Sequence, residues 1–363
     1  MPPDEPSWWY AQDGSGRLQQ ALLSPAGWLY GRMAERRFAK RAGYRSRLPI
    51  ICVGNFTAGG TGKTPLTQAL VAGMAQRGQR PVVLSRGYGG AMRGPVRVDG
   101  TVHRAAEVGD EPLLLAQTAD VVIARDRRAG VQLIEAGSSP IDAVIMDDGL
   151  QNPTVTKDLV IALIDGARGV GNGAVIPAGP LRAPMDFQFA LADAIVVNGR
   201  STVAGRETVV LDELRRRFPG PVLEAQVTPV GETAWLLDQP LVAYSGIGNP
   251  ARFFGLLTGA GADVVETRTF GDHHQFKERE AQELIALADA RGAQLVTTEK
   301  DWVRLSREGG ALEALQSRSR TVPIRLAFQE ADEARLFSLI DAALKTGGYR
   351  RPDLSPGPGP AGG

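Results

Sequence analysis

The segment from residue 49 to 70, PIICVGNFTAGGTGKTPLTQAL, constrains the fold of this chain more than any other. A short apolar run leads into a glycine-rich stretch, and a lysine and a hydroxyl residue follow before an apparent helix. In this strand–loop–helix order, consecutive backbone N–H groups turn inward around phosphate oxygens. Such a loop lies at the carboxyl end of a buried strand in a parallel α/β sheet. The segment therefore predicts a nucleotide-binding α/β domain.

Two side chains and the glycines of this loop have defined tasks in phosphate binding. Lys63 brings positive charge to the phosphates, and the Thr64 hydroxyl is a ligand for Mg²⁺. The glycines let the backbone curve so that its N–H groups point at one anion. We expect the nucleotide to contact the whole loop, namely Thr57, Ala58, Gly59, Gly60, Thr61, Gly62, Lys63 and Thr64.

Apolar runs separated by helical segments continue from residue 48 onward. The runs PVVLS, ADVVIA, AVIMDDG, LVIALID and DAIVVN are typical of parallel strands covered on both faces. After a turn-rich stretch with two extended pieces, PLVAYSGIGNPARFF begins a second alternation. We predict an α/β protein: a P-loop NTPase-type parallel sheet in an α/β/α domain, with a second, smaller α/β/α domain. The expected boundaries are 1–47 for a basic amphipathic segment, 48–220 for the P-loop core, 221–240 for a two-stranded linker, 241–345 for the smaller domain and 346–363 for a disordered tail.

Two acidic pairs stand where a metal site or a helix cap would use them. Asp147 and Asp148 directly follow the apolar run AVIM, which places them at the edge of the sheet where the phosphate loop opens. An Asp-Gly turn is the alternative, but a turn does not require two adjacent acids, and we favour a role in holding Mg²⁺. Asp110 and Glu111 precede Pro112, and this pattern by itself favours an N-terminal helix cap.

SRGYGG at 85–90 and FGDHHQF at 270–276 also contain side chains that bind or react. Tyr88 could stack on a substrate or hydrogen-bond to it, although a plain glycine turn explains the first segment equally well. Adjacent histidines on a strand point to opposite faces, and no further Cys or His stands near them, so we exclude a zinc site. Asp272 and a histidine could instead form an acid–base pair in a loop.

Residues 15–47 combine apolar periodicity with an excess of arginine. The apolar residues that recur at helical intervals, and the aromatic residues beside them, are Leu18, Leu22, Leu29, Met33, Phe38, Trp28 and Tyr30. The basic residues are Arg17, Arg32, Arg36, Arg37, Lys40, Arg41, Arg45 and Arg47, against the single acid Glu35. An interfacial helix on an anionic membrane has this composition. A helix packed on the protein's own core is equally compatible, and Pro25 and Gly27 would bend or break a single helix.

Composition excludes several classes of protein. The formal net charge of the 363 residues is +1, so the field of the whole molecule does not indicate a nucleic-acid partner. We find no apolar run of about eighteen residues, and therefore expect no helix that spans a membrane. The single cysteine, Cys52, lies in the apolar run LPIICVGN; it excludes a disulfide within the chain and agrees with a reducing compartment.

Eight segments together resemble one family, tetraacyldisaccharide 4′-kinase. They are VGNFTAGGTGKTP, LSRGYGG, GDEPLLLA, DDGLQN, PAGPLRAP, YSGIGNPARFF, FGDHH and TTEKD, and they occur in the order typical of that family. The usual phosphate loop has glycine where this chain has Thr57, but the T-x-G-G-T-G-K-T-P form is itself typical of the family. Thr57 is therefore interpreted as a family variant of a working loop.

The resemblance also implies roles for particular residues. Asp110 would be the general base, His273 would pair with it, and Lys63 would stabilise the transferred phosphate. The implied metal ligands are Thr64, Asp147, Asp148 and Glu111, and the implied substrate contacts are Tyr88, Gln151 and Arg182. The family usually has histidine where this chain has Asn152, so we assign Asn152 no catalytic part; whether His274 compensates is open.

The implied activity is phosphorylation of the 4′-hydroxyl of a tetraacyldisaccharide 1-phosphate, which forms lipid IV-A, with ATP and Mg²⁺. The acceptor is embedded in a membrane, so the N-terminal helix would lie on the cytoplasmic face of the bacterial inner membrane. We expect no nucleic-acid partner and infer no obligate protein partner. The alternative is a soluble P-loop kinase or ligase that acts on a small metabolite. A GTPase switch or metallochaperone would need a guanine-reading N-K-x-D and a metal-ligand cluster, and the sequence has neither.

Overall fold

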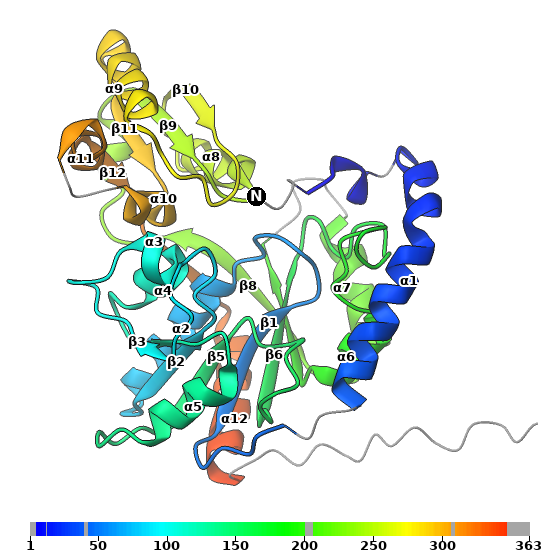
Figure 1. Cartoon of the computed structure of the whole chain (residues 1–363). Coiled ribbons are helices and arrows are strands. Elements are labelled where there is room, and N and C mark those ends of the chain that lie inside the picture. The colour runs from blue at the N-terminus through cyan, green and yellow to red at the C-terminus, as the bar shows by residue number, and fades with distance from the viewer. Residues whose placement is uncertain (1–4, 12, 40–42, 200–205, 306–308, 347–363) are drawn as a thin grey trace, which may run out of the picture.

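The computed structural model describes residues 5–11, 13–39, 43–199, 206–305 and 309–346 (Figure 1). Lys40, Arg41 and the predicted tail from residue 347 lie outside the described residues. The described chain forms a large unit around a nine-stranded sheet and a small unit around a four-stranded sheet.

The large sheet is parallel except at its two outermost pairs of strands. In sheet order its strands are β13 (Ile324–Phe328), β8 (Val222–Pro229), β7 (Ala194–Asn198), β6 (Leu159–Asp165), β1 (Ile50–Asn55), β5 (Ala143–Asp147), β2 (Pro81–Ser85), β4 (Asp120–Ile123) and β3 (Val96–Arg97). The pairs β13–β8 and β3–β4 are antiparallel, and every other pair is parallel. Every residue of β1 is buried, because β1 lies centrally and helices cover both faces.

Alternate residues of β1 serve two different cores. Ile51 and Val53 pack with α2 (Lys63–Gln76) and α12 (Glu330–Thr346) on one face of the sheet. On the other face, the helices are α5 (Arg127–Glu135), α6 (Met185–Leu191) and α7 (Arg206–Arg217). The short helices α3 (Ala105–Val108) and α4 (Asp110–Leu115) lead into β4. This arrangement confirms the predicted α/β fold.

The small unit is a second parallel sheet with helices on both faces. Its strands, in sheet order, are β10 (Val264–Thr269), β9 (Leu241–Ser245), β11 (Gln294–Thr297) and β12 (Ser319–Thr321). One core includes α8 (Pro250–Gly259), and the other includes α9 (Glu278–Arg291) and α11 (Gly310–Arg318). The chain also forms α10 (Glu299–Arg304) and the 3₁₀ turns η1 (Ser7–Trp9) and η2 (Ala234–Leu237).

After the small unit, the chain returns to the large one. β13 pairs with β8, and Leu336, Phe337 and Ile340 of α12 lie in the core beneath β1. A Cβ on Gly73 of α2 would lie 2.0 Å from the Phe337 ring, so the two helices are in close contact. The packing differs from the expected domain at 241–345, because the apolar face of α12 is buried against the large sheet. We propose that 50–229 and 324–346 form the large unit and that 241–321 form the small one.

The N-terminal segment forms one helix, α1 (Arg17–Ala39), in spite of Pro25 within it. Figure 1 shows α1 along the side of the large unit, next to α6. Its buried residues are Gly27 and Gly31; a Cβ on Gly27 would lie 2.6 Å from the Val175 carbonyl oxygen. The glycines therefore form the contact face of the helix. Among the described helices, none combines the length and the apolar character that crossing a membrane requires.

Candidate active site

The phosphate loop leaves β1 and ends at the first residue of α2. Gly62 precedes α2 with φ +99°, a conformation that favours glycine, and the helix begins at Lys63. The Asn198 side-chain amide, at the end of β7, donates to the Thr61 carbonyl at 2.8 Å. The Ala58 N–H donates to the Pro180 carbonyl at 2.8 Å, so this N–H is already used within the protein. The loop is therefore braced from two sides at the carboxyl end of the sheet.

Asp148 connects the lysine of the loop to a second cation. Its Oδ1 accepts from Arg182 Nη1 at 2.7 Å and lies 3.9 Å from Lys63 Nζ. Arg182 also donates from Nε to the Thr57 carbonyl at 3.1 Å. Burial alone would raise the pKa of Asp148, but the charges of Lys63 and Arg182 outweigh it and hold that pKa below its usual range. The structure thus places three of the predicted residues, Lys63, Asp148 and Arg182, in one cluster.

Asp147 is the buried carboxylate of this region that lacks a strong partner. Its Oδ2 accepts from Ser85 Oγ at 3.3 Å, whereas its Oδ1 is buried and has no hydrogen-bond partner among the described residues. Burial, with the charges of Glu111 and Asp148, raises the pKa of Asp147 to about 7. A buried, unpartnered carboxylate oxygen beside a phosphate loop fits a divalent cation, which would favour the ionised form.

Glu111 and Lys300 form an ion pair that joins the two units. Lys300, on α10, contacts Glu111 at the start of α4. Burial opposes ionisation of Glu111, but Lys300 outweighs it and lowers the pKa of Glu111. Among the described residues, no three His, Cys, Asp or Glu side chains are grouped as a metal site. Glu111 is therefore held by a protein cation, not by a cluster of acids.

Asp110 and His273 meet where the two units are in contact. His273 Nδ1 lies 3.2 Å from Asp110 Oδ2, and His273 has φ +57°. Arg304 also donates to Asp110 Oδ2, from Nε at 2.8 Å and from Nη2. Burial alone would raise the pKa of Asp110, but the hydrogen bond from His273 and the charges of Lys300 and Arg304 hold it far below its usual range. The predicted acid–base pair is thus formed by two segments far apart in the sequence.

Tyr88 lies beside this pair. Its ring centroid is 5.1 Å from that of His273, and 49% of the residue is exposed. Gln151 lies elsewhere: its Nε2 donates to the Asn55 carbonyl at 2.9 Å and to Gln188 Oε1 at 2.8 Å. Tyr88 therefore presents an accessible aromatic face next to His273, whereas the Gln151 amide is engaged at the end of β1.

Neither Asn152 nor His274 lies against Asp110. Asn152 Oδ1 accepts from the Thr154 N–H at 2.8 Å and from the Thr154 hydroxyl at 2.6 Å, which stabilises a local turn. His274 Nε2 lies 2.8 Å from Glu280 Oε2, and its ring stacks on Phe270. His274 is thus occupied within the small unit, and the geometry gives it no part in replacing a histidine at position 152.

The start of the described chain lies across the phosphate loop. A Cβ on Gly59 would be 1.9 Å from Glu5 Oε1, and Glu5 pairs with Arg168 at 3.0 Å. Because a carboxylate repels phosphate, nucleotide binding at this loop requires Glu5 to move. Glu5 is not among the predicted site residues, since its distance from the loop along the chain gives no sign of the contact.

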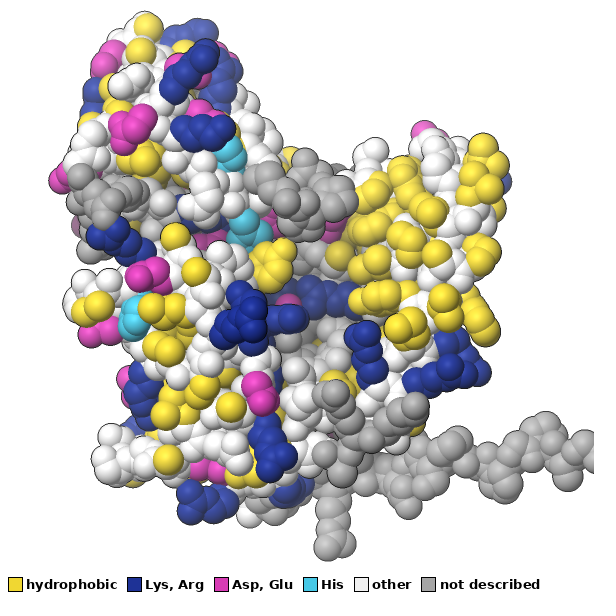
Figure 2. All heavy atoms as spheres, in the orientation of Figure 1, with side chains coloured by type: hydrophobic (Ala, Val, Ile, Leu, Met, Phe, Trp, Pro, Cys, Tyr) yellow, Lys and Arg dark blue, Asp and Glu magenta, His cyan; other side chains and the backbone are white. Residues whose placement is uncertain are grey.

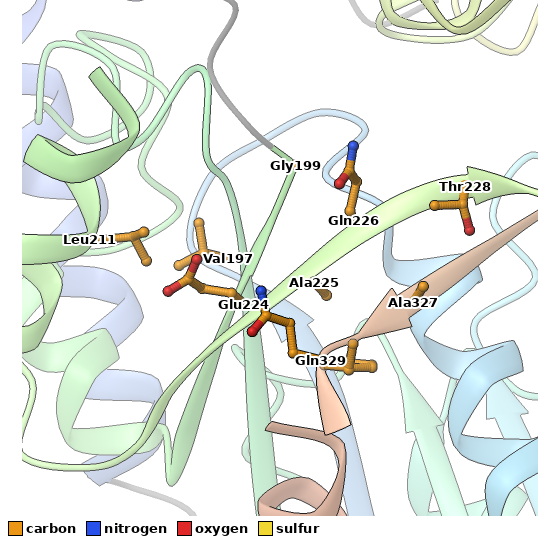
Figure 3. Close-up of a pocket in the computed structure, with 10 residues that line it drawn as sticks. Val197, Gly199, Leu211, Glu224, Ala225, Gln226, Thr228, Ala327 and Gln329 are labelled. Atoms are coloured by element: carbon orange, nitrogen blue, oxygen red, sulfur yellow. The ribbon is translucent and has the colours of Figure 1, made fainter. Parts of the chain in front are cut away.

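A cavity of about 190 Å³ lies beyond the end of β7, beside β8 and β13 (Figure 3). Its lining includes Gly199, Glu224, Gln226 and Gln329. None of the predicted site residues lines this cavity. Gly199 directly follows Asn198, the residue that braces the phosphate loop.

Three cations at the site were not among the predicted residues: Arg127 and Arg304, which are buried, and Lys300, which is half-buried. Arg127 donates to the Asp147 carbonyl at 3.0 Å and so fixes the end of β5. The segment TTEKDWVRL contains Lys300 and Arg304, and their spacing of four residues places both on one side of a helix. That spacing could have indicated that Lys300 and Arg304 act at one site. It does not reveal the acidic residues with which they pair.

Comparisons with known proteins find similar sequences over nearly the whole chain. The family model for tetraacyldisaccharide-1-P 4′-kinase matches residues 19–345. A tetraacyldisaccharide 4′-kinase of Methylobacterium nodulans is 45% identical over 349 residues, which cover 96% of this chain and 97% of that protein. One of a Bradyrhizobium species is 44% identical over 360 residues, with 98% and 99% covered.

A solved structure gives the same fold. The crystal structure of LpxK from Aquifex aeolicus, described as an apo form in complex with ATP, has a TM-score of 0.68 and 24% sequence identity. The match covers 90% of this chain and 99% of that one. With a family model that spans most of the chain and near full-length relatives, the resemblance predicted from the eight segments is confirmed: the chain belongs to the tetraacyldisaccharide 1-phosphate 4′-kinase family.

Proposed function

We propose that this chain transfers the γ-phosphate of ATP to the 4′-hydroxyl of a tetraacyldisaccharide 1-phosphate, forming lipid IV-A in lipid A biosynthesis. Membership of the family and the names of its relatives support this activity. The observation that carries it is the distance of 3.2 Å between Asp110 Oδ2 and His273 Nδ1. A kinase for a sugar hydroxyl needs such a base beside a phosphate loop, and this one forms where the two units meet.

The small unit also reaches the phosphate loop itself, which supports a reaction where the two units meet. A Cβ on Gly248, in the loop after β9, would lie 3.2 Å from Asp272 Oδ2 and 3.5 Å from the Gly60 nitrogen. The loop before His273 and the phosphate loop thus both approach Gly248, in the loop after β9. A nucleotide on the phosphate loop would have groups of both units around its γ-phosphate.

The residues where the two units meet can supply the proton transfer and the charge stabilisation that the reaction needs. The acceptor hydroxyl has a pKa far above neutral and must lose its proton as it attacks the γ-phosphate. Asp110 accepts that proton, and His273 orients the carboxylate. Lys63 neutralises charge on the transferred group, and positioning supplies much of the acceleration. Tyr88 is placed to contact the acceptor sugar beside His273.

We assign the Mg²⁺ site to Asp147, with the Thr64 hydroxyl as the second protein ligand. Mg²⁺ commonly uses one or two protein ligands together with phosphate oxygens and water, which suits the unpartnered Asp147 Oδ1. When bound, Mg²⁺ would offset the negative charge of the phosphates. Asp148 and Glu111 are paired with Arg182 and Lys300, so we propose that they shape the field around the metal without binding it directly.

We further propose that α1 places the enzyme on the cytoplasmic face of the inner membrane. Leu18 and Leu22 are 71% and 72% exposed, and Trp28 is 67% exposed. Figure 2 shows hydrophobic side chains gathered over α1 and the surface beside it, with Lys and Arg below them. Each buried CH₂ of an acyl chain is worth about 0.8 kcal/mol, so the acceptor stays in the bilayer and the enzyme must go to it. The soluble alternative leaves this exposed apolar surface without a purpose.

Phosphate transfer to the lipid tests the proposed function. Labelled γ-phosphate from ATP should appear in a tetraacyldisaccharide 1-phosphate held in detergent micelles with Mg²⁺. Lys63→Ala should abolish labelling, whereas Lys345→Ala, at an exposed lysine near the end of α12, should not change it. Labelling of a soluble sugar in place of the lipid would favour the small-metabolite kinase.

A further inference from the structure

Arg304 is a cation enclosed almost completely where the two units meet. Its side chain is 1% exposed, and that of Asp110 is 4% exposed. Arg304 ends α10 in the small unit, whereas Asp110 begins α4 in the large unit. The guanidinium of the small unit therefore contacts the proposed base of the large unit. Any role of Arg304 in catalysis rests on the proposed function, in which Asp110 is that base.

The two carboxylate oxygens of Asp110 differ in the hydrogen bonds that they accept. Oδ2 receives Arg304 Nε at 2.8 Å, Arg304 Nη2, and His273 Nδ1 at 3.2 Å. Oδ1 accepts one N–H from the described chain, that of Glu111 at 3.0 Å. A carboxylate oxygen has room for about two such donors, so Oδ2 is filled and Oδ1 keeps a free lone pair.

The guanidinium is itself held in a fixed orientation. Its Nη1 donates to Asp301 Oδ1 and to the Gly246 carbonyl, both at 2.7 Å. Asp301 is fixed in turn by Ser245 Oγ at 3.1 Å and Thr298 Oγ1 at 2.7 Å. Each nitrogen of the fork thus has a defined acceptor, which the single ammonium of lysine could not reproduce.

His273 depends on the same carbonyl. The His273 N–H donates to the Gly246 carbonyl at 3.1 Å, next to the Arg304 Nη1 bond to that oxygen. One loop of the small unit therefore sets the position of both groups that contact Asp110 Oδ2. Movement of the small unit away from the large one would withdraw both together.

We infer that Arg304 is a positioning residue: it holds Asp110 so that Oδ1 alone faces the acceptor, and it does so only when the two units are together. In the transfer, the acceptor oxygen forms its bond to the γ-phosphorus while the bond to the bridging oxygen of ADP breaks. The hydroxyl proton passes to Asp110 Oδ1. Arg304 exchanges no proton and contacts no substrate.

Two substitutions test the positioning role against a structural one. Arg304→Met should lower kcat about 100-fold, the size expected when a catalytic group shifts by about 1 Å, and leave ATP affinity within about threefold. Arg304→Lys, which keeps the charge and loses the fork, should recover part of the loss. Arg318→Met is the matched control, since Arg318 pairs with Asp289 on the surface of the same unit.

The test is completed in the Asp110→Asn background. There Arg304→Met should change the residual kcat less than about threefold, because the base that it positions is already lost. The same factor of loss in both backgrounds would overturn the inference, as would an unchanged kcat in Arg304→Met or Arg304→Lys. If Arg304→Met does not bind ATP, the comparison is made with Arg304→Lys. Failure of the wild type to label the lipid would instead overturn the proposed function, and this role with it.

Discussion

The ionised Asp147 carboxylate is needed to bind a metal ion, but it lowers the stability of the folded protein when no metal ion is bound. Its pKa of about 7 compares with 3.8 for an ordinary aspartate. Between these two values the folded protein keeps a proton that the unfolded chain has lost, so this group makes the protein less stable as the pH rises. Above pH 7, its buried charge is a cost that persists until a cation binds.

We therefore expect Asp147→Asn to stabilise the protein at pH 8 without divalent cations, by on the order of 2 kcal/mol, and to have little effect near pH 4. Thermal unfolding at both values of pH measures this difference. Mg²⁺ should raise the melting temperature of the wild type and not of the variant, and phosphate transfer by the variant should fall sharply. Asp238→Asn, at an exposed aspartate, is the control. An equal stabilisation of Asp147→Asn at both pH values would contradict this account.

Short motifs predicted the residues near the phosphate loop but not those that complete the site. Lys63 follows the loop that leaves β1, and Asp147 is the last residue of β5. In a parallel sheet the carboxyl ends of strands meet at one edge. The contact between Arg304 and Asp110 spans 194 positions of the chain and joins two units. Its existence depends on how those units dock, which no local pattern encodes.

At the scale of the element, α1 is unusual because its apolar residues face outward. Leu22 and Leu29 are 72% and 55% exposed, whereas Gly27 and Gly31 pack against the protein. The periodicity predicted an amphipathic helix. It did not decide whether the apolar side of that helix packs on the protein's own core or lies on a membrane. Glycines allow a close approach of backbones, so the glycine side of α1 packs against the protein and the bulky side chains on its other side stay exposed.

We expect the double variant Leu22→Asp, Leu29→Asp to bind anionic vesicles at least tenfold more weakly than the wild type, since each buried leucine is worth about 1.5–3 kcal/mol. Vesicle sedimentation measures this binding. ATP affinity should not change, because α1 lies beside α6 and not at the phosphate loop. Gln19→Asp adds charge at an exposed position of the same helix and should have a small effect. Undiminished vesicle binding of the double variant would remove α1 as the membrane contact.

At the scale of the whole molecule, the last helix holds the large unit together. Phe337 is 5% exposed, lies against Gly73, and has the Arg77 guanidinium 3.7 Å from its ring centroid. Phe337→Ala should therefore lower the free energy of unfolding by about 3–5 kcal/mol. Urea unfolding measures the loss, and Val265→Ala, at a partly exposed position of the small unit, should cost much less. A loss for Phe337→Ala as small as that for Val265→Ala would show that α12 contributes little to this core.

The fold class could be predicted because buried parallel strands are apolar nearly throughout, a pattern that this chain repeats. The sequence did not allow us to predict how the chain passes between the two units. β13 and α12 follow the small unit directly in sequence, and their alternation matches either sheet. Only the pairing of β13 with β8, and the apolar face that α12 buries, assign them to the large unit.

The proposed reaction requires that Asp110, held in place by His273 and Arg304 of the small unit, act as the base for an acceptor hydroxyl beside the phosphate loop of its own unit. The direct measurement is phosphate transfer to micellar tetraacyldisaccharide 1-phosphate by Asp110→Asn, with ATP affinity measured on the same preparation. We predict that kcat falls by at least about 100-fold, as for loss of a general base, while ATP binds as it does to the wild type. Wild-type turnover in Asp110→Asn would contradict the assignment of Asp110 as the base, and with it the proposal that the reaction takes place where the two units meet.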